Sequence, residues 1–296
     1  MRQFTESLYS LPKMAAVFAT IASLFFGACT RSPIAATSSS ESTYDRIIRT
    51  GVLRAAYISY PPACMKDSAT GKMSGIFVDA LERAAENLGW KLNWTEEVGW
   101  GSQIEGLQTG RYDIVGSPVW ANPTRGKLTT LSIPLYYSGI GIYVRNDDDR
   151  FTADRKAIDA PTVRISTIDG ETGDLIAKTQ FPNAKRVSLP QLTDISQLFL
   201  EVSNRKGDVL FAEPYYGFKF SETNPGKVKN IAVAQPVKIL GNCYMMKQNE
   251  FVLKQSLDIA LADLLGSRFI DALLDKYEPF PGAFYRVAEP YRALTK

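Results

Sequence analysis

The most consequential absence in this 296-residue chain is histidine, of which there is none. Without imidazole, Ser-His-Asp and Cys-His catalysis are excluded, and a zinc enzyme is disfavoured because histidine is a principal zinc ligand. A strong excess of one charge is also missing, since 34 basic and 31 acidic side chains leave a net charge of +3. No basic run indicates nucleic-acid binding. Any catalysis would depend on carboxylates, Lys, Tyr or Cys, and the sequence indicates neither a metal nor a cofactor.

Long apolar runs are missing after residue 28, so the rest of the chain is not expected to span a membrane. The N-terminus is different. Residues 14–28 are mostly apolar and follow the basic residues Arg2 and Lys13. A run of this length is too short to cross a bilayer and is typical of the apolar core of a secretion signal. We therefore predict a signal peptide over residues 1–28 and an exported protein.

Small residues directly precede Cys29 and resemble the lipobox of bacterial lipoproteins, in which the cysteine is lipidated. Ordinary cleavage near Ala28 or Ala36 and an uncleaved anchor are the alternatives. Residues 29–43 are mainly small and polar and predict a flexible tether. The expected location is periplasmic or extracytoplasmic, with membrane attachment if Cys29 carries lipid.

Cysteine is scarce, with three in the whole chain. If Cys29 is lipidated, Cys64 and Cys243 remain, and export would place them in an oxidising compartment where they could form a disulfide. The alternative is two separate buried thiols that behave as small hydrophobic side chains.

Apolar periodicity predicts strands and helices in alternation over the first part of the chain. Apolar residues that recur at helical spacing define helices, and short apolar runs between turn residues define strands. The predicted order is strand 52–57, helix 77–88, strand 91–96, helix 102–109 and strand 112–116. This βαβαβ order predicts an α/β protein with a parallel, doubly wound sheet.

A second set of alternating elements follows a charged turn at 146–150. Its predicted elements are strand 163–167, a helix from Thr172, a strand within 182–188, helix 195–202, strand 208–212, helix 253–265, and a last helix capped by Ser267. The chain therefore predicts two α/β lobes of similar plan. Ligands of such sheets bind beyond the carboxyl ends of the strands, so a cleft between the lobes is the expected site.

One local motif predicts binding of a carboxylate. Asn122 precedes Pro123, and Arg125 follows two residues later. Asn is a favoured helix N-cap and Pro a favoured first helical residue. A helix start here would present backbone N–H groups and a guanidinium together, which suits a carboxylate. The alternative is a capped surface helix with a solvated Arg125.

Motifs spread over residues 44–277 resemble, in order, the family-3 solute-binding proteins of bacterial ABC importers, which bind polar amino acids. The motifs are IRTGVLR at 48–54, YPP at 60–62, GIFVD at 75–79, IEGLQTGRYD at 104–113, PTR at 123–125, SIPLYY at 132–137, GET at 170–172, GDV at 207–209 and LADL at 261–264.

The resemblance implies a two-lobed periplasmic-binding-protein fold of type II. Lobe 1 would comprise residues 44–139 plus 240–296, and lobe 2 residues 140–239, joined by hinge strands that cross near 140–143 and 237–241. It also implies a monomeric, non-catalytic binding component of an ABC importer. Such a protein captures a small zwitterion, such as an amino acid or an analogue, closes around it and delivers it to a permease in the inner membrane.

The resemblance further implies roles for seven residues. Arg125 would hold the ligand carboxylate, and Thr172 would donate to the same group unless it is only a helix cap. Glu213 stands where the family usually has Asp, which pairs with the ligand ammonium; a Glu turned to solvent is the alternative. The other four are Asn122 in place of a usual Thr, Tyr60 covering the ligand, Ser117 offering a hydroxyl, and Trp120 forming a pocket wall.

Two other functions stay open at this point. The same fold includes a periplasmic dehydratase of cyclohexadienyl acids, in which a carboxyl group is the general acid; Glu213 in a closed cleft could take that role. An accessory or sensory protein that binds an organic acid or a partner protein is the third option, because four positions depart from the usual pattern: Ala63, Pro118, Trp120 and Glu213. Trp100 is predicted to belong to the core rather than to the site.

Overall fold

The computed structural model describes residues 41–287. The predicted signal peptide, Cys29 and most of the predicted tether lie outside these residues. Helix α1 (Thr43–Thr50) begins at the last residue of the predicted tether, where the Ser42 side chain accepts a hydrogen bond from the Asp45 N–H at 3.0 Å. Within residues 41–287, the helices are all too short or too polar to cross a membrane.

The first strand group is parallel, as predicted. Strand β1 (Val52–Tyr57) lies between β4 (Lys91–Glu97) and β5 (Ile114–Trp120), with Val52 opposite Lys91 and Ala55 opposite Ile114. Helices α2 (Ile76–Asn87) and α3 (Gln103–Thr109) connect these strands. Because parallel neighbours require crossover connections, the βαβαβ order of the sequence produces this arrangement.

The second strand group repeats this plan. Strand β8 (Arg164–Ile168) lies between β9 (Lys185–Leu189) and β10 (Val209–Ala212), all parallel. The helices of this group are α5 (Thr172–Gln180), α6 (Ser196–Ser203) and α7 (Pro214–Thr223). Helix α7 was not predicted, although its buried residues Tyr216, Gly217 and Phe220 recur at helical spacing.

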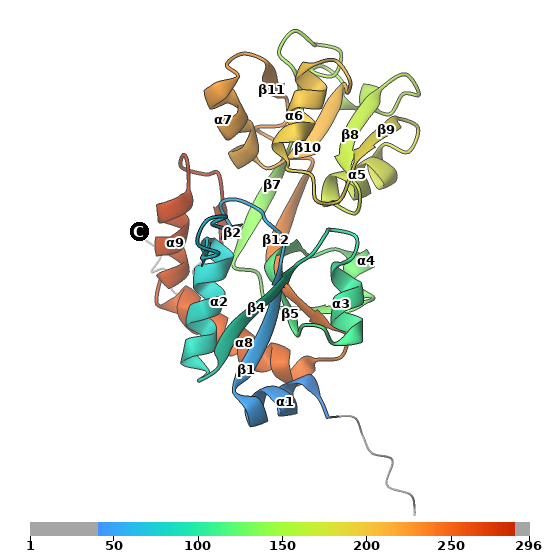
Figure 1. Cartoon of the computed structure of the whole chain (residues 1–296). Helices are drawn as coiled ribbons and strands as arrows, with labels where there is room; N and C mark the ends of the chain where they lie inside the picture. The colour runs from blue at the N-terminus through green and yellow to red at the C-terminus, as the bar shows by residue number, and fades with distance from the viewer. Residues whose placement is uncertain (1–40, 288–296) are drawn as a thin grey trace, which may run out of the picture. The chain divides into compact units, whose positions relative to one another are not determined.

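Two long strands join the groups into one mixed sheet. β7 (Tyr136–Arg145) and β12 (Lys238–Lys247) pair antiparallel, and the sheet order is β4-β1-β5-β12-β7-β10-β8-β9 (Figure 1). The sheet is therefore parallel within each group and antiparallel where the groups meet. Residues 238 and 140 are register partners, as are 241 and 137. These strands coincide with the predicted hinge crossings; the division into lobes 44–139 plus 240–296 and 140–239 stays a prediction.

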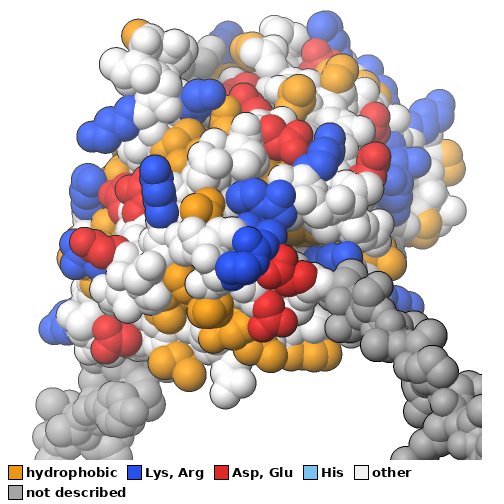
Figure 2. Space-filling model, turned by 60° about the horizontal axis from the view of Figure 1, so that its bottom comes forward, with side chains coloured by type: hydrophobic (Ala, Val, Ile, Leu, Met, Phe, Trp, Pro, Cys, Tyr) orange, Lys and Arg blue, Asp and Glu red, His pale blue; other side chains and the backbone are white. Residues whose placement is uncertain are grey.

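Shorter elements complete the described part of the chain. They are β2 (Met65–Lys66), β3 (Met73–Ser74), α4 (Pro123–Gly126), β6 (Thr129–Leu131), η1 (Arg155–Ile158), β11 (Val228–Asn230), α8 (Phe251–Gly266), α9 (Phe269–Tyr277) and β13 (Tyr285–Arg286). On the face shown in Figure 2, basic and acidic side chains are interspersed, which agrees with the near balance of charge in the sequence.

Two predicted boundaries are wrong. Strand β5 continues to Trp120 through Pro118, because the proline lies in a bulge of β5: residues 116–118 lie opposite the single residue 244 of β12, so no ladder N–H is needed from the proline. Ser267 does not cap the last helix: it ends α8, and Arg268, in the left-handed region at φ 64°, precedes α9.

The disulfide that the sequence left open between Cys64 and Cys243 is absent. Cys64 and Cys243 are both free and buried, so the alternative of two small hydrophobic thiols describes them. Cys64 packs with Tyr57, Met73 and Val78, whereas Cys243 lies on β12. Burial raises the pKa of each thiol to about 12, which keeps both in the unreactive protonated form.

Candidate functional site

The candidate site lies at the carboxyl ends of strands from both parallel groups, which run in opposite directions in the sheet. Trp100 follows β4, Tyr60 follows β1, Arg125 follows β5, Thr172 follows β8, and Glu213 directly follows β10. Carboxyl ends of parallel strands gather ligand-binding side chains at one edge of an α/β sheet. Here the two strand groups contribute to the same place, since a small closed cavity, too narrow to admit a water molecule, is lined by residues from both: Tyr60, Trp100, Pro118, Trp120, Arg125 and Thr172.

Arg125 is positioned by the helix start that the sequence predicted. The Asn122 side chain accepts a hydrogen bond from the Arg125 N–H at 2.9 Å, and Pro123 is the first helical residue. The guanidinium is buried rather than solvated, with 8% of the residue exposed, and burial lowers the pKa of Arg125. Its Nη1 donates to the Trp120 carbonyl at 3.1 Å and to Thr172 Oγ1 at 3.4 Å. The alternative of a solvated surface arginine is wrong.

The start of α5 carries a second charge that the sequence analysis did not assign. Glu171, not Thr172, is the N-cap: its Oε2 accepts a hydrogen bond from the Gly173 N–H at 2.5 Å. Thr172 is the first helical residue, so the interpretation of it as a plain cap is wrong. Burial raises the pKa of Glu171 to about 7, against the opposing effects of the Gly173 and Thr172 N–H groups and of Arg125.

Glu213 faces inward and is 1% exposed, so the alternative of a solvent-facing glutamate is wrong. Tyr60 Oη donates to Glu213 Oε2 at 3.0 Å, while Oε1 is buried without a hydrogen-bond partner among the described residues. Burial raises the pKa of Glu213 to about 7. A buried carboxylate oxygen without a donor is costly unless a ligand supplies one.

Aromatic rings surround the Tyr60 side chain. Its ring centroid lies 5.4 Å from Trp100, 6.4 Å from Trp120 and 5.0 Å from Tyr216. Tyr216 Oη donates to the Pro61 carbonyl at 2.6 Å, so α7 contacts the loop after β1. Trp100 belongs to the main core cluster, as predicted, and also lines the cavity. The Trp120 indole N–H is buried without a partner among the described residues.

The remaining predicted residues are structurally engaged. Ser117 Oγ accepts from the Ile58 N–H at 2.7 Å and donates to the Ile58 carbonyl at 2.8 Å, so its hydroxyl holds the end of β1 against β5. The Asn122 oxygen is used in capping, and its amide nitrogen donates to the Trp120 carbonyl at 3.4 Å. These two residues position the site more than they line it.

Sequence reasoning missed Glu171 and Tyr216 and assigned Trp100 to the core alone. Glu171 had a detectable signal, since an acceptor side chain directly before a helix is a common N-cap. The signal for Trp100 was its place between two glycines just after a strand. Tyr216 had none, because its contact with Tyr60 joins segments far apart in the sequence.

The strongest feature of the site is its uncompensated charge. Eight charged side chains are buried within residues 41–287. Five of them form ion pairs: Asp113, Arg145, Asp148, Asp174 and Asp208. The other three are Arg125, Glu171 and Glu213, and no described residue gives any of them an ion pair within 4.0 Å. Buried charges are normally paired, so these three, which also act on one another electrostatically, are candidates to bind a charged ligand.

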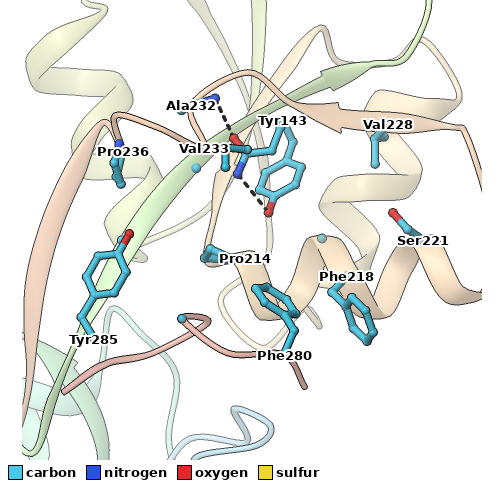
Figure 3. Close-up of a pocket in the computed structure, with 15 residues that line it drawn as sticks. Tyr143, Pro214, Phe218, Ser221, Val228, Ala232, Val233, Pro236, Phe280 and Tyr285 are labelled. Atoms are coloured by element: carbon cyan, nitrogen blue, oxygen red, sulfur yellow. Dashed lines mark hydrogen bonds between the residues drawn. The ribbon is translucent and has the colours of Figure 1, made fainter. Parts of the chain in front are cut away.

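A larger hollow of about 430 Å³ lies against α7 and has a different chemistry. Pro214, Phe218, Phe280 and Tyr285 point into it, and no charged side chain lines it (Figure 3). It offers nothing to compensate a charged molecule. Within residues 41–287, no group of His, Cys, Asp and Glu side chains could hold a metal ion.

Two known proteins are similar to this chain in sequence. A cyclohexadienyl dehydratase of Pseudomonas aeruginosa is 26% identical over 212 residues, which cover 71% of this chain and 76% of that enzyme. A probable amino-acid ABC transporter-binding protein of Haemophilus influenzae is 30% identical over 91 residues, or 31% of this chain and 35% of that protein.

Among solved structures, the ancestral amino-acid-binding protein AncCDT-1, a precursor of cyclohexadienyl dehydratase, has the same fold. It aligns with a TM-score of 0.68 at 24% identity, covering 80% of this chain and 99% of that one. The family model for bacterial extracellular solute-binding proteins, family 3, matches residues 53–280, most of the present chain. The chain therefore belongs to the bacterial extracellular solute-binding proteins, family 3.

Proposed function

We propose that this protein is the substrate-binding component of an ABC importer and captures a small zwitterion, an amino acid or close analogue, in the cleft between the two strand groups. The observation that carries the proposal is the set of three buried charges, Arg125, Glu171 and Glu213, that have no ion-pair partner within residues 41–287. Charges of both signs in one cleft match a ligand that itself carries both signs.

Each ligand group has a counterpart in the cleft. The α-carboxylate binds the Arg125 guanidinium and the Thr172 hydroxyl, which already lie 3.4 Å apart. The α-ammonium donates to the unpartnered Oε1 of Glu213. Tyr60, Trp100 and Trp120 enclose the rest of the ligand and exclude water, which strengthens both ion pairs.

Transport follows from where these groups lie. Arg125 belongs to the first strand group and Glu213 to the second, so a ligand that binds both stabilises their approach. β7 and β12, which join the groups, are the proposed hinge. The closed form would be recognised by an inner-membrane permease, in keeping with the amino-acid ABC transporter role named for the relative from Haemophilus influenzae.

Thermal unfolding of the purified protein against a panel of amino acids, amines and organic acids tests the proposal. A ligand at about 100 times its dissociation constant stabilises the native state by roughly 2.7 kcal/mol, a clear rise in unfolding temperature. Arg125→Ala should abolish the rise, because the carboxylate then has no guanidinium. The matched control, Arg111→Ala, removes an exposed arginine and should keep the rise.

The panel also separates this proposal from an accessory or sensory role. A rise produced by one group of amino acids and lost in Arg125→Ala supports amino-acid capture. If only carboxylates without an amino group stabilise the protein, the accessory role for organic acids is favoured. If a rise survives in Arg125→Ala, the assigned pocket is wrong.

A cyclohexadienyl-type dehydratase is the second candidate. Two observations favour it: the 26% identity to such an enzyme over 71% of the chain, and a buried carboxyl, Glu213, with a pKa of about 7. A carboxyl of that pKa can donate a proton near neutral pH, as loss of water requires. Formation of a phenyl product from prephenate or arogenate that is lost in Glu213→Gln would establish it. No product at high enzyme concentration would exclude it.

A further inference from the structure

Glu171 is the charge that the proposed function leaves unexplained. It is 4% exposed and forms no ion pair within the described residues. It lies beside Thr172, whose hydroxyl is 3.4 Å from Arg125. Its carboxylate accepts from Gly173 N–H, a donor that an incoming anion would otherwise use at the start of α5. The anion-binding end of the cleft therefore already contains an anion that belongs to the protein.

Counting charges gives the consequence. Arg125 contributes one positive charge, and Glu171 and Glu213 contribute two negative charges when ionised. A zwitterion brings one charge of each sign, so after it binds to Arg125 and Glu213 the Glu171 carboxylate is still unpaired. The N–H groups of α5 offset only part of that charge, since even with them the pKa of Glu171 is raised to about 7.

Building on the proposed function, we propose that Glu171 makes the cleft select ligands of net positive charge. The bound molecule then carries a carboxylate and two cationic groups, as a basic amino acid or a close analogue does. A neutral amino acid leaves one buried carboxylate uncompensated and binds more weakly. An acidic amino acid adds a further negative charge and binds most weakly.

The walls of the cavity suit a second cation. Trp100, Trp120 and Tyr60 line it, and aromatic faces attract ammonium and guanidinium groups. Glu171 acts electrostatically on Arg125 at one end and on Tyr60 and Glu213 at the other. A cationic side chain that binds between these groups, with the cleft opened to admit it, therefore lies within the electrostatic influence of Glu171.

The test compares arginine with citrulline, which has nearly the same shape but replaces the guanidinium with a neutral ureido group. Isothermal titration of the purified protein at pH 7.5 should give at least tenfold tighter binding of arginine. In Glu171→Gln the ratio should fall to about threefold or less, with citrulline bound no more weakly than before. Glu171→Asp keeps the charge and should keep the preference. Glu105→Gln removes an exposed carboxylate and should leave the ratio unchanged.

The outcomes distinguish this inference from the proposed function. If citrulline or another neutral amino acid binds as tightly as arginine and depends on Arg125, amino-acid capture stands and charge selection by Glu171 is wrong. An unchanged ratio in Glu171→Gln also overturns it. If no amino acid binds, the proposed function itself fails. Glutamine retains an acceptor for the Gly173 N–H, so the variant should fold; if it does not, the wild-type ratio decides alone.

Discussion

Lowering the pH from 8 to 5 should stabilise the unliganded protein, which is the reverse of ordinary acid denaturation. Burial raises the pKa of Glu171 and Glu213 from 4.5 to about 7, so the folded protein binds these protons more tightly than the unfolded chain does. This contribution to the free energy of unfolding is fully present below about pH 4.5 and is lost as the pH rises through 7.

The magnitude follows from these pKa values. One carboxyl with a pKa of 4.5 unfolded and about 7 folded contributes about 2.5 kcal/mol more at pH 5 than at pH 8. Two independent groups would give about 5 kcal/mol, an upper figure because the two carboxyls interact. Few other groups should titrate between pH 5 and 8. The chain has no histidine, and Asp208, whose pKa is about 2, titrates below this range.

Urea unfolding followed by tryptophan fluorescence at pH 5, 6.5 and 8 measures this dependence. Glu213→Gln should remove about half of it and should stabilise the protein at pH 8, where the wild type buries a charge. Glu105→Gln is the control and should behave as the wild type. The reasoning is refuted if the wild type is as stable at pH 8 as at pH 5, or if Glu213→Gln keeps the full dependence.

Two further predictions concern parts of the fold outside the cleft. Because Cys64 and Cys243 are free, a reductant should not change the unfolding temperature, and both thiols should react with a thiol reagent only in denaturant; a fall in unfolding temperature on reduction would contradict the structure. Gly217→Ala would place a Cβ 2.2 Å from the Tyr143 ring and should destabilise the protein by about 1–3 kcal/mol in urea unfolding. Gly266→Ala, with open space around it, should be neutral or slightly stabilising, and equal effects of the two would refute the packing argument.

Local signals predicted what local interactions determine. The parallel βαβ units followed from periodicity, because each strand and helix buries its own apolar face. The capped start at Asn122 and Pro123 followed from short-range hydrogen bonding. Elements fixed by distant partners were missed. β5 continues through Pro118 because β5 is bulged where it pairs with β12, and α7 is held by Tyr216 against the loop after β1.

Sequence-based prediction of the site was limited in the same way, because contacts between distant residues decide which side chains are available. The family resemblance predicted ligand contacts for both Ser117 and Glu213, and both are buried. Their availability differs because of their partners: the Ser117 hydroxyl is used by Ile58, whereas one oxygen of Glu213 has no donor among the described residues. Whether a polar side chain is available to a ligand therefore depends on whether the fold already supplies its hydrogen-bond partners.

The net charge of the cleft likewise depends on residues that only the fold brings together. Arg125, Glu171 and Glu213 follow three different strands, β5, β8 and β10, and are separated by long stretches of sequence. No sequence window contains all three, and each one alone resembles the charged residues that the fold pairs elsewhere, as it pairs Asp113 with Arg46 and Arg54. The excess of negative charge arises only when the fold brings the ends of these strands, from two oppositely directed groups, into one cleft. Calorimetry can test this view. If arginine binds more tightly than citrulline and the preference depends on Glu171, then the net charge of these three side chains, rather than any sequence motif, determines the charge of the ligand.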